Sequence, residues 1–122
     1  MTLENLLMKD TISTDPLAPS LVVFGRTARR MDEVIRLLRD TGVVSAYGTF
    51  KEAEALERIA TVPRLGVVLL GGAIEEASRC RIRDELARNH PGVLTSEPGQ
   101  QYPYSDENIV ADLQIKLGAL GK

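Results

Sequence analysis

The chain has 122 residues and a mass of 13.4 kDa, which is enough for one domain with its own hydrophobic core. Its 15 basic and 17 acidic residues give a formal net charge of −2, which disfavours binding to a nucleic-acid backbone. A single cysteine excludes an internal disulfide, and no apolar run approaches the roughly 20 residues that a membrane helix needs. We therefore expect a cytoplasmic protein that contacts neither nucleic acid nor membrane.

Residues 1–20 are predicted to form a leader that precedes the domain. Leu3, Leu6 and Leu7 recur at helical spacing, and the prolines of the segment STDPLAPS then interrupt regular structure. Because such a short helix is unstable alone, it either frays or serves as a dimer arm or a partner-binding helix. The sequence leaves both alternatives open.

The domain is predicted to begin with a strand and a helix. Residues 21–25 (LVVFG) form a short apolar run that is typical of a strand. Residues 28–41 then carry apolar side chains at helical spacing, and Gly42 ends this pattern.

Two further strands follow in the same alternation. Residues 43–50 (VVSAYGTF) predict a strand, and residues 51–62 predict a helix that Pro63 ends. Residues 65–70 (LGVVLL) form the most apolar run of the chain. A strand without polar alternation is buried on both faces, as in the centre of a parallel sheet.

The last part of the chain predicts two helices around a fourth strand. Residues 74–89 form a charged helix, and residues 93–96 (VLTS) form the strand. The final helix begins at Ser105, whose hydroxyl suits a helix cap, with two acidic residues placed favourably for the helix dipole.

Strands that alternate with helices predict a parallel α/β sheet with right-handed crossovers. The order of the elements, with the most apolar strand third, resembles the response-regulator receiver, a flavodoxin-like fold. The resemblance covers residues 21–96 and implies a short, doubly wound α/β/α domain over residues 21–122. Its four-stranded parallel sheet would have the order 2-1-3-4.

The receiver's reactive residues are missing from this chain. Receivers bind magnesium with acidic residues after the first strand, where this chain has residues 25–27 (GRT). Gly71 or Gly72 replaces the phosphate-accepting aspartate, and Thr95 or Ser96 stands where a receiver has its switching hydroxyl. The nine residues 97–105 leave no room for a helix and a fifth strand. The resemblance therefore implies a pseudo-receiver that is not phosphorylated and holds no metal or cofactor.

The expected binding site lies beyond the carboxyl ends of the first and third strands, where ligands bind in parallel α/β sheets. The residues predicted to line it are Gly25, Arg26, Thr27, Gly71 and Gly72. The two glycines serve either a tight turn with close packing or the space for a flat ligand.

Arg29 and Arg30 lie in the first turn of the helix that follows, where positive charge opposes the helix dipole. One interpretation is that they hold a phosphate or carboxylate. The other is that they point to solvent and pair with Asp32 or Glu33.

Two other surfaces are candidates for recognition. Gln100, Gln101 and Tyr102 form either a recognition loop near the same sheet edge or a simple connection. On the third helix, the side opposite Ser78, Ile82 and Leu86 is either solvated or an interface with a second copy or a partner. Its small residues are Ala77, Cys80, Asp84 and Ala87, with Arg79, Arg81, Arg83 and Arg88 as a predicted rim.

The sequence contains neither a GxSxG elbow nor a pair of carboxylates at strand ends, so we expect no enzyme. The first expectation is a non-catalytic, receiver-like regulatory module that contacts a protein partner or forms a homodimer. The alternative is a small-ligand sensor that binds an anionic metabolite at the carboxyl edge of the sheet.

Overall fold

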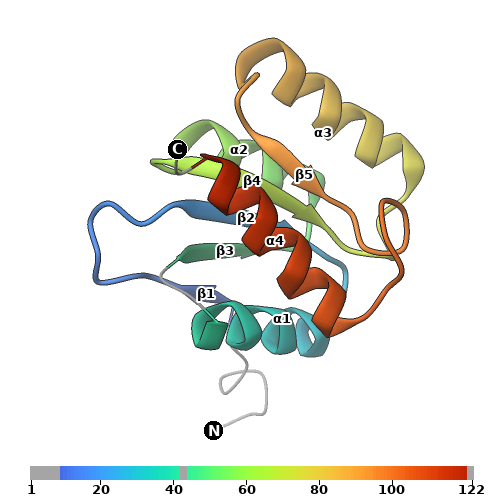
Figure 1. The fold of residues 1–122 in the computed structure, drawn as a ribbon. Coiled ribbons are helices and arrows are strands. Elements are labelled where there is room, and N and C mark those ends of the chain that lie inside the picture. The colour runs from blue at the N-terminus through green and yellow to red at the C-terminus, as the bar shows by residue number, and fades with distance from the viewer. Residues whose placement is uncertain (1–8, 42–43, 121–122) are drawn as a thin grey trace, which may run out of the picture.

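The computed structural model describes residues 9–41 and 44–120. They form a five-stranded sheet of order β1-β3-β2-β4-β5, with helices on both faces (Figure 1). The strands are β1 (Asp10–Thr11), β2 (Ser20–Phe24), β3 (Ser45–Thr49), β4 (Leu65–Leu70) and β5 (Leu94–Ser96). The helices are α1 (Ala28–Thr41), α2 (Glu52–Thr61), α3 (Glu76–Asn89) and α4 (Asp106–Leu120).

The predicted four-stranded, fully parallel sheet of order 2-1-3-4 is wrong. The segment predicted as leader contributes a fifth strand, β1, which pairs antiparallel with β3 through Asp10 and Thr11. The sheet is therefore mixed, with four parallel strands in the order β3-β2-β4-β5 beside the added edge strand. The helix predicted around Leu3, Leu6 and Leu7 lies outside the described residues.

Two hydrophobic cores lie on opposite faces of the sheet because successive strand residues alternate between faces. In β2, Leu21 and Val23 pack in the core that α1 and α4 cover, whereas Val22 and Phe24 pack in the core under α2 and α3. All five residues of β2 are buried. This burial on both faces holds the carboxyl end of β2 in a fixed position.

The helix ends follow local hydrogen bonding. Ser105 caps α4, because its Oγ accepts a hydrogen bond from the backbone N–H of Asn108 at 3.1 Å. Glu54 accepts hydrogen bonds from the N–H groups of Phe50 and Lys51 at the start of α2. The helix predicted from residue 74 begins later, at Glu76, and Ile74 is buried in the core instead.

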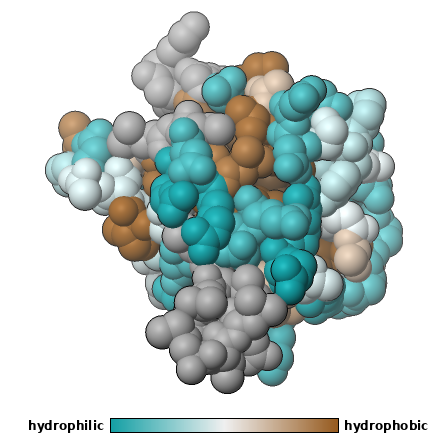
Figure 2. All heavy atoms as spheres, turned by 90° about the horizontal axis from the view of Figure 1, so that it is seen from below, coloured by the Kyte–Doolittle hydropathy of each residue, from teal (hydrophilic) through white to brown (hydrophobic). Residues whose placement is uncertain are grey.

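The described surface has few large exposed hydrophobic side chains, and these come from separate segments: Ile12, Leu17, Tyr104 and Ile115. Seen from below the view of Figure 1, the surface is mainly hydrophilic (Figure 2). Among the described residues, no helix is both long and apolar enough to span a membrane.

Candidate functional site

A pocket of about 300 Å³ opens at the carboxyl ends of β2 and β4. It is lined by Val23, Phe24, Gly25, Arg26, Thr27, Arg30, Met31, Val34, Leu69, Gly71, Gly72, Ala73, Pro98, Tyr104 and Ile109. The polypeptide leaves β2 toward α1 on one face of the sheet and leaves β4 toward α3 on the other. Such a divergence of connections produces a crevice in parallel α/β sheets.

The structure brings together most of the residues predicted at this edge. Gly25, Arg26, Thr27, Gly71 and Gly72 all line the pocket, and so does one further candidate, Arg30. The remaining candidates are described but are not among its lining residues: Arg29, Ser96, Gln100, Gln101 and Tyr102.

Gly71 and Gly72, the two glycines after β4, differ in the space around them. The N–H of Gly71 donates to the Phe24 carbonyl at 2.9 Å, and a Cβ at this position would lie 3.3 Å from the same oxygen. Gly71 therefore allows the ends of β2 and β4 to approach closely. A Cβ on Gly72 would meet only the ring of Tyr104, at the ordinary contact distance of 3.7 Å. Gly72 thus leaves space in the pocket.

Arg26 joins three loops at the mouth of the pocket. Its Nε and Nη2 donate to Glu75 Oε1 at 3.2 and 2.6 Å, and its Nη1 donates to the Phe50 carbonyl at 2.9 Å. Its guanidinium also lies over the ring of Phe24, 4.9 Å from the centroid. The hydrogen bonds from Arg26 lower the pKa of the Glu75 carboxyl.

Arg30 connects α1 to the start of α4. Its Nε donates to Tyr104 Oη at 2.6 Å, its Nη1 to Glu33 at 2.9 Å and its Nη2 to Asp106 at 2.7 Å. Burial acts to lower the pKa of Arg30, but the hydrogen bonds to Asp106, Glu33 and Tyr104 raise it overall. Both arginines of the pocket are therefore paired with carboxylates of the same chain.

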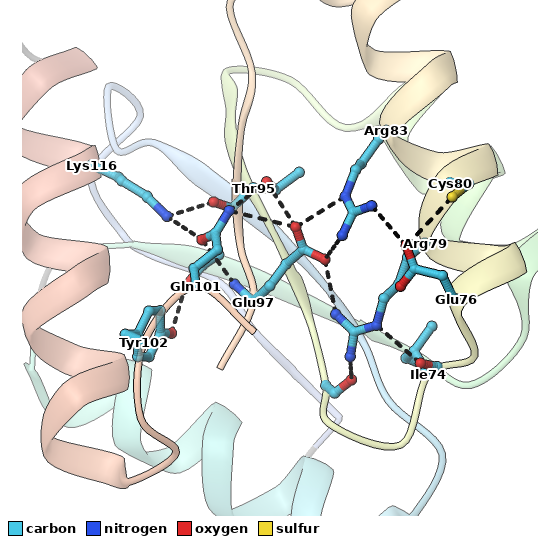
Figure 3. Close-up of polar contacts among 12 residues, drawn as sticks. Ile74, Glu76, Arg79, Cys80, Arg83, Thr95, Glu97, Gln101, Tyr102 and Lys116 are labelled. Carbon is cyan, nitrogen blue, oxygen red and sulfur yellow. Dashed lines mark hydrogen bonds and ion pairs between the residues drawn. The ribbon is translucent and has the colours of Figure 1, made fainter. Parts of the chain in front are cut away.

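A buried ion pair between α3 and the loop after β5 lies next to residues of the pocket lining in the sequence (Figure 3). The side chains of Arg79 and Glu97 are 1% and 3% exposed, and Arg79 Nη1 donates to Glu97 Oε1 at 2.9 Å. Arg79 also donates to the carbonyls of Gly71 and Ile74. Gly71 lines one wall and Pro98, the neighbour of Glu97, lines another. Arg79 thus links the loop after β4 to the loop after β5.

The prediction that Arg79 lies on the exposed rim of α3 is wrong. It is buried beside Ser78, Ile82 and Leu86 because its guanidinium reaches the carbonyls of the β4–α3 loop. Its position three residues before Ile82 is a signal for the buried face that the sequence contained.

Glu97 also connects to residues on either side of β5. Arg83 Nη2 donates to Glu97 Oε1 at 2.7 Å, and Gln101 Oε1 accepts from the Glu97 backbone N–H at 3.2 Å. Burial acts to raise the pKa of Glu97, but hydrogen bonds from Arg83 and Arg79 lower it overall. Gln101 is therefore part of a structural network, together with Lys116, whose Nζ donates to Gln101 Oε1 and to the Thr95 carbonyl.

Ser96 and Tyr102 form a second polar cluster apart from the pocket. Ser96 Oγ lies 2.8 Å from Tyr102 Oη and donates to Asp112 at 2.6 Å. Burial raises the pKa of Tyr102. These residues hold the loop after β5 against α4.

Several pocket residues were not expected from the sequence. Tyr104 precedes the cap of α4, and its exposed ring lines the pocket together with Ile109. The other lining residues that were not expected are Val23, Phe24, Met31, Val34, Leu69, Ala73 and Pro98. The available signal for Tyr104 was its position directly before a helix cap, in the loop that follows the last strand at the carboxyl edge of the sheet.

The expected interface residues on α3, namely Ala77, Cys80, Asp84 and Ala87, are all exposed. Asp84 forms a salt bridge of 3.0 Å with Arg88 on the same helix. Within the described ranges, His, Cys, Asp and Glu side chains form no group of three or more that could hold a metal ion.

Comparison of the chain with protein-family models, with curated proteins and with solved structures finds no match. The receiver-like relationship stays a prediction from the order of the elements.

Proposed function

We propose that this protein is a non-catalytic sensor that binds one small molecule in the pocket at the carboxyl ends of β2 and β4. The observation that carries the proposal is the pocket itself, about 300 Å³ in volume and lined mainly by apolar side chains. Pockets that hold small molecules are concave and mostly apolar, with a few polar groups that orient the ligand.

Two features favour ligand binding over a purely structural role for this edge. Gly72 lines the pocket within the turn from Gly71 to Ile74, but a Cβ there would meet no backbone, so close packing does not require glycine at this position. The rim carries Arg26, Thr27 and Arg30, which supply hydrogen-bonding groups beside the apolar walls. A flat edge for docking a protein would lack such a hollow.

We also propose that the protein makes a regulatory contact with a protein partner or with a second copy of the chain. A sensor needs a surface that responds to the ligand. The helix α3 begins at Glu76, a few residues after Gly71 and Gly72 of the pocket lining. The exposed side of α3 with Ala77, Cys80 and Ala87 is the candidate for that contact.

The proposal is tested by two-dimensional NMR of the isotopically labelled protein with a set of small aromatic and aliphatic probes. The set is indole, phenol, phenylacetate, hexanol and hexanoate. We expect shifts concentrated at the amides of Gly71, Gly72, Ala73 and Tyr104. The variant Gly72→Val should weaken binding by about tenfold or more, because its side chain occupies the pocket beside Tyr104.

Gly92→Val is the matched control, because a Cβ on Gly92 would meet nothing within 4 Å and the position lies in the turn after α3. Its affinity for the probes should equal that of the native chain. If no probe shifts the pocket amides, or if both variants bind like the native protein, the proposed function is incorrect.

A further inference from the structure

The walls of the pocket are apolar on almost every side. Aliphatic, aromatic and thioether side chains line it from β2, β4, α1, α4 and the loops after β4 and β5, among them Phe24, Met31, Leu69, Pro98 and Ile109. The side chains with polar groups at the rim are Arg26, Thr27, Arg30 and, through its hydroxyl, Tyr104. Most of the surface of a bound molecule would therefore contact hydrocarbon.

The positive charge of the rim is already balanced by the protein. Glu75 accepts two hydrogen bonds from Arg26, and Glu33 and Asp106 each accept one from Arg30. Two guanidinium groups thus face three carboxylates, and this gives the rim no excess of positive charge.

An anionic ligand would gain little from this arrangement. It would have to exchange places with Glu75 or Asp106 at a guanidinium, replacing one carboxylate contact by another, while the displaced carboxylate stays nearby. An uncharged acceptor avoids this repulsion. Arg26 makes three hydrogen bonds in the described structure, whereas a guanidinium has five N–H groups, so a neutral oxygen or nitrogen can still be accommodated.

The volume of the pocket limits the size of the ligand. About 300 Å³ lies at the lower end of the range of about 300 to 1,000 Å³ for small-molecule sites. A molecule with one or two fused rings, or a short aliphatic chain, fits this size better than a nucleotide.

We infer that the pocket selects small, uncharged, mainly apolar molecules with one hydrogen-bonding group, and that the carboxylates paired with Arg26 and Arg30 exclude anions. The inference rests on the proposed function and specifies the ligand class of the same site. It departs from the anionic ligand that the arginines of residues 25–30 suggest in the sequence.

The test compares two pairs of probes that differ in charge: indole with indole-3-carboxylate, and hexanol with hexanoate. Dissociation constants come from NMR titration of the pocket amides at constant ionic strength. In the native protein, the neutral member of each pair should bind at least about fivefold more tightly. Tighter binding of the anions to the same amides would overturn the inference but leave the proposed function intact.

The double variant Glu75→Gln with Asp106→Asn tests the cause of the selectivity. Removing two carboxylate charges should shift the ratio of affinities toward the anionic probes by about fivefold. The matched control is Glu76→Gln, because Glu76 lies at the same end of α3 but pairs with Arg83. An unchanged ratio in the double variant, or an equal change in the control, would overturn the inference. Absence of binding by these four probes and by phenol and phenylacetate would overturn both proposals.

Discussion

At position 48, the absence of a side chain is a requirement of packing. A Cβ on Gly48 would lie 2.5 Å from the Lys9 carbonyl oxygen and 2.8 Å from the sulfur of Met31. The Gly48 N–H donates to that carbonyl at 2.9 Å and to the Asp10 carboxylate at 3.0 Å. Gly48 therefore lets β1 and α1 both approach β3 at one point.

Replacing Gly48 by alanine should lower the free energy of unfolding by about 1 to 3 kcal/mol, because the backbone of residue 9 must move to relieve the clash. Urea denaturation measures this difference. The control is Gly92→Ala, where a Cβ has open space and the change should stay within about 0.5 kcal/mol. Equal stability of the two variants would contradict the packing role of Gly48.

Residues of the site could be predicted from the sequence where their position depends on the neighbouring strand alone. The positions of Gly25, Arg26 and Gly72 follow from their place directly after strands, and all three line the pocket. The partners of Arg26 could not be predicted, because Glu75 lies 49 residues away and meets it only when β2 and β4 are neighbours. Tertiary contacts of this kind leave no periodic signal along the chain.

At the scale of elements, the buried side chain of Arg79 connects α3 to the residues that follow β4 and β5. The fork of Arg79 contacts two carbonyls of the β4–α3 loop and the carboxylate of Glu97 after β5. Lysine has a single ammonium group and cannot reproduce this planar arrangement of donors. The position therefore requires arginine for its geometry as well as its charge.

The variant Arg79→Lys should lower the free energy of unfolding by about 3 kcal/mol, as expected when a buried ion pair loses its geometry. Arg88→Lys on the same helix is the control, because Arg88 is 72% exposed and surface substitutions change stability by only about 0.5 kcal/mol. Urea unfolding followed by circular dichroism separates the two effects. A stability of Arg79→Lys within the range of the control would refute the bridging role.

Elements with a strong pattern were predictable, and the element without one was not. The range of α1 follows from its apolar side chains at helical spacing, and β4 follows from six consecutive residues suited to burial on both faces. In contrast, β1 has only two polar residues, Asp10 and Thr11, and exists because their backbone pairs with β3. The residue types of such a short strand do not predict it from the sequence.

Over the whole molecule, carboxylate and guanidinium groups connect elements that are distant in the sequence. Glu52 of α2 accepts two hydrogen bonds of 2.7 Å from Arg81 of α3, and Glu75 and Glu97 bind arginines in the same way. The hydrogen bonds from Arg81 lower the pKa of Glu52 from 4.5 to about 2. The pKa values of Glu54, Glu75 and Glu97 are lowered as well.

These shifts predict that the protein loses stability in acid. A carboxyl whose pKa is lower in the folded chain stabilises the fold above the unfolded value of 4.5, and this contribution disappears as the pH falls toward the folded value. The free energy of unfolding should therefore decline steadily from about pH 4.5 to about pH 2, between the unfolded pKa of 4.5 and the folded pKa of about 2 for Glu52.

The variant Glu52→Gln should be less stable than the native chain at pH 6 but should lose less stability on acidification, because residue 52 no longer takes up a proton on unfolding. Glu57→Gln, an exposed position of the same helix, serves as the control and should keep the native dependence on pH. Urea midpoints measured every half pH unit from 6 to 2 compare the three chains. If the slopes of Glu52→Gln and the native protein coincide between pH 4.5 and 2, the Glu52–Arg81 pair does not contribute to the acid sensitivity, and the coupling between α2 and α3 must depend on packing alone.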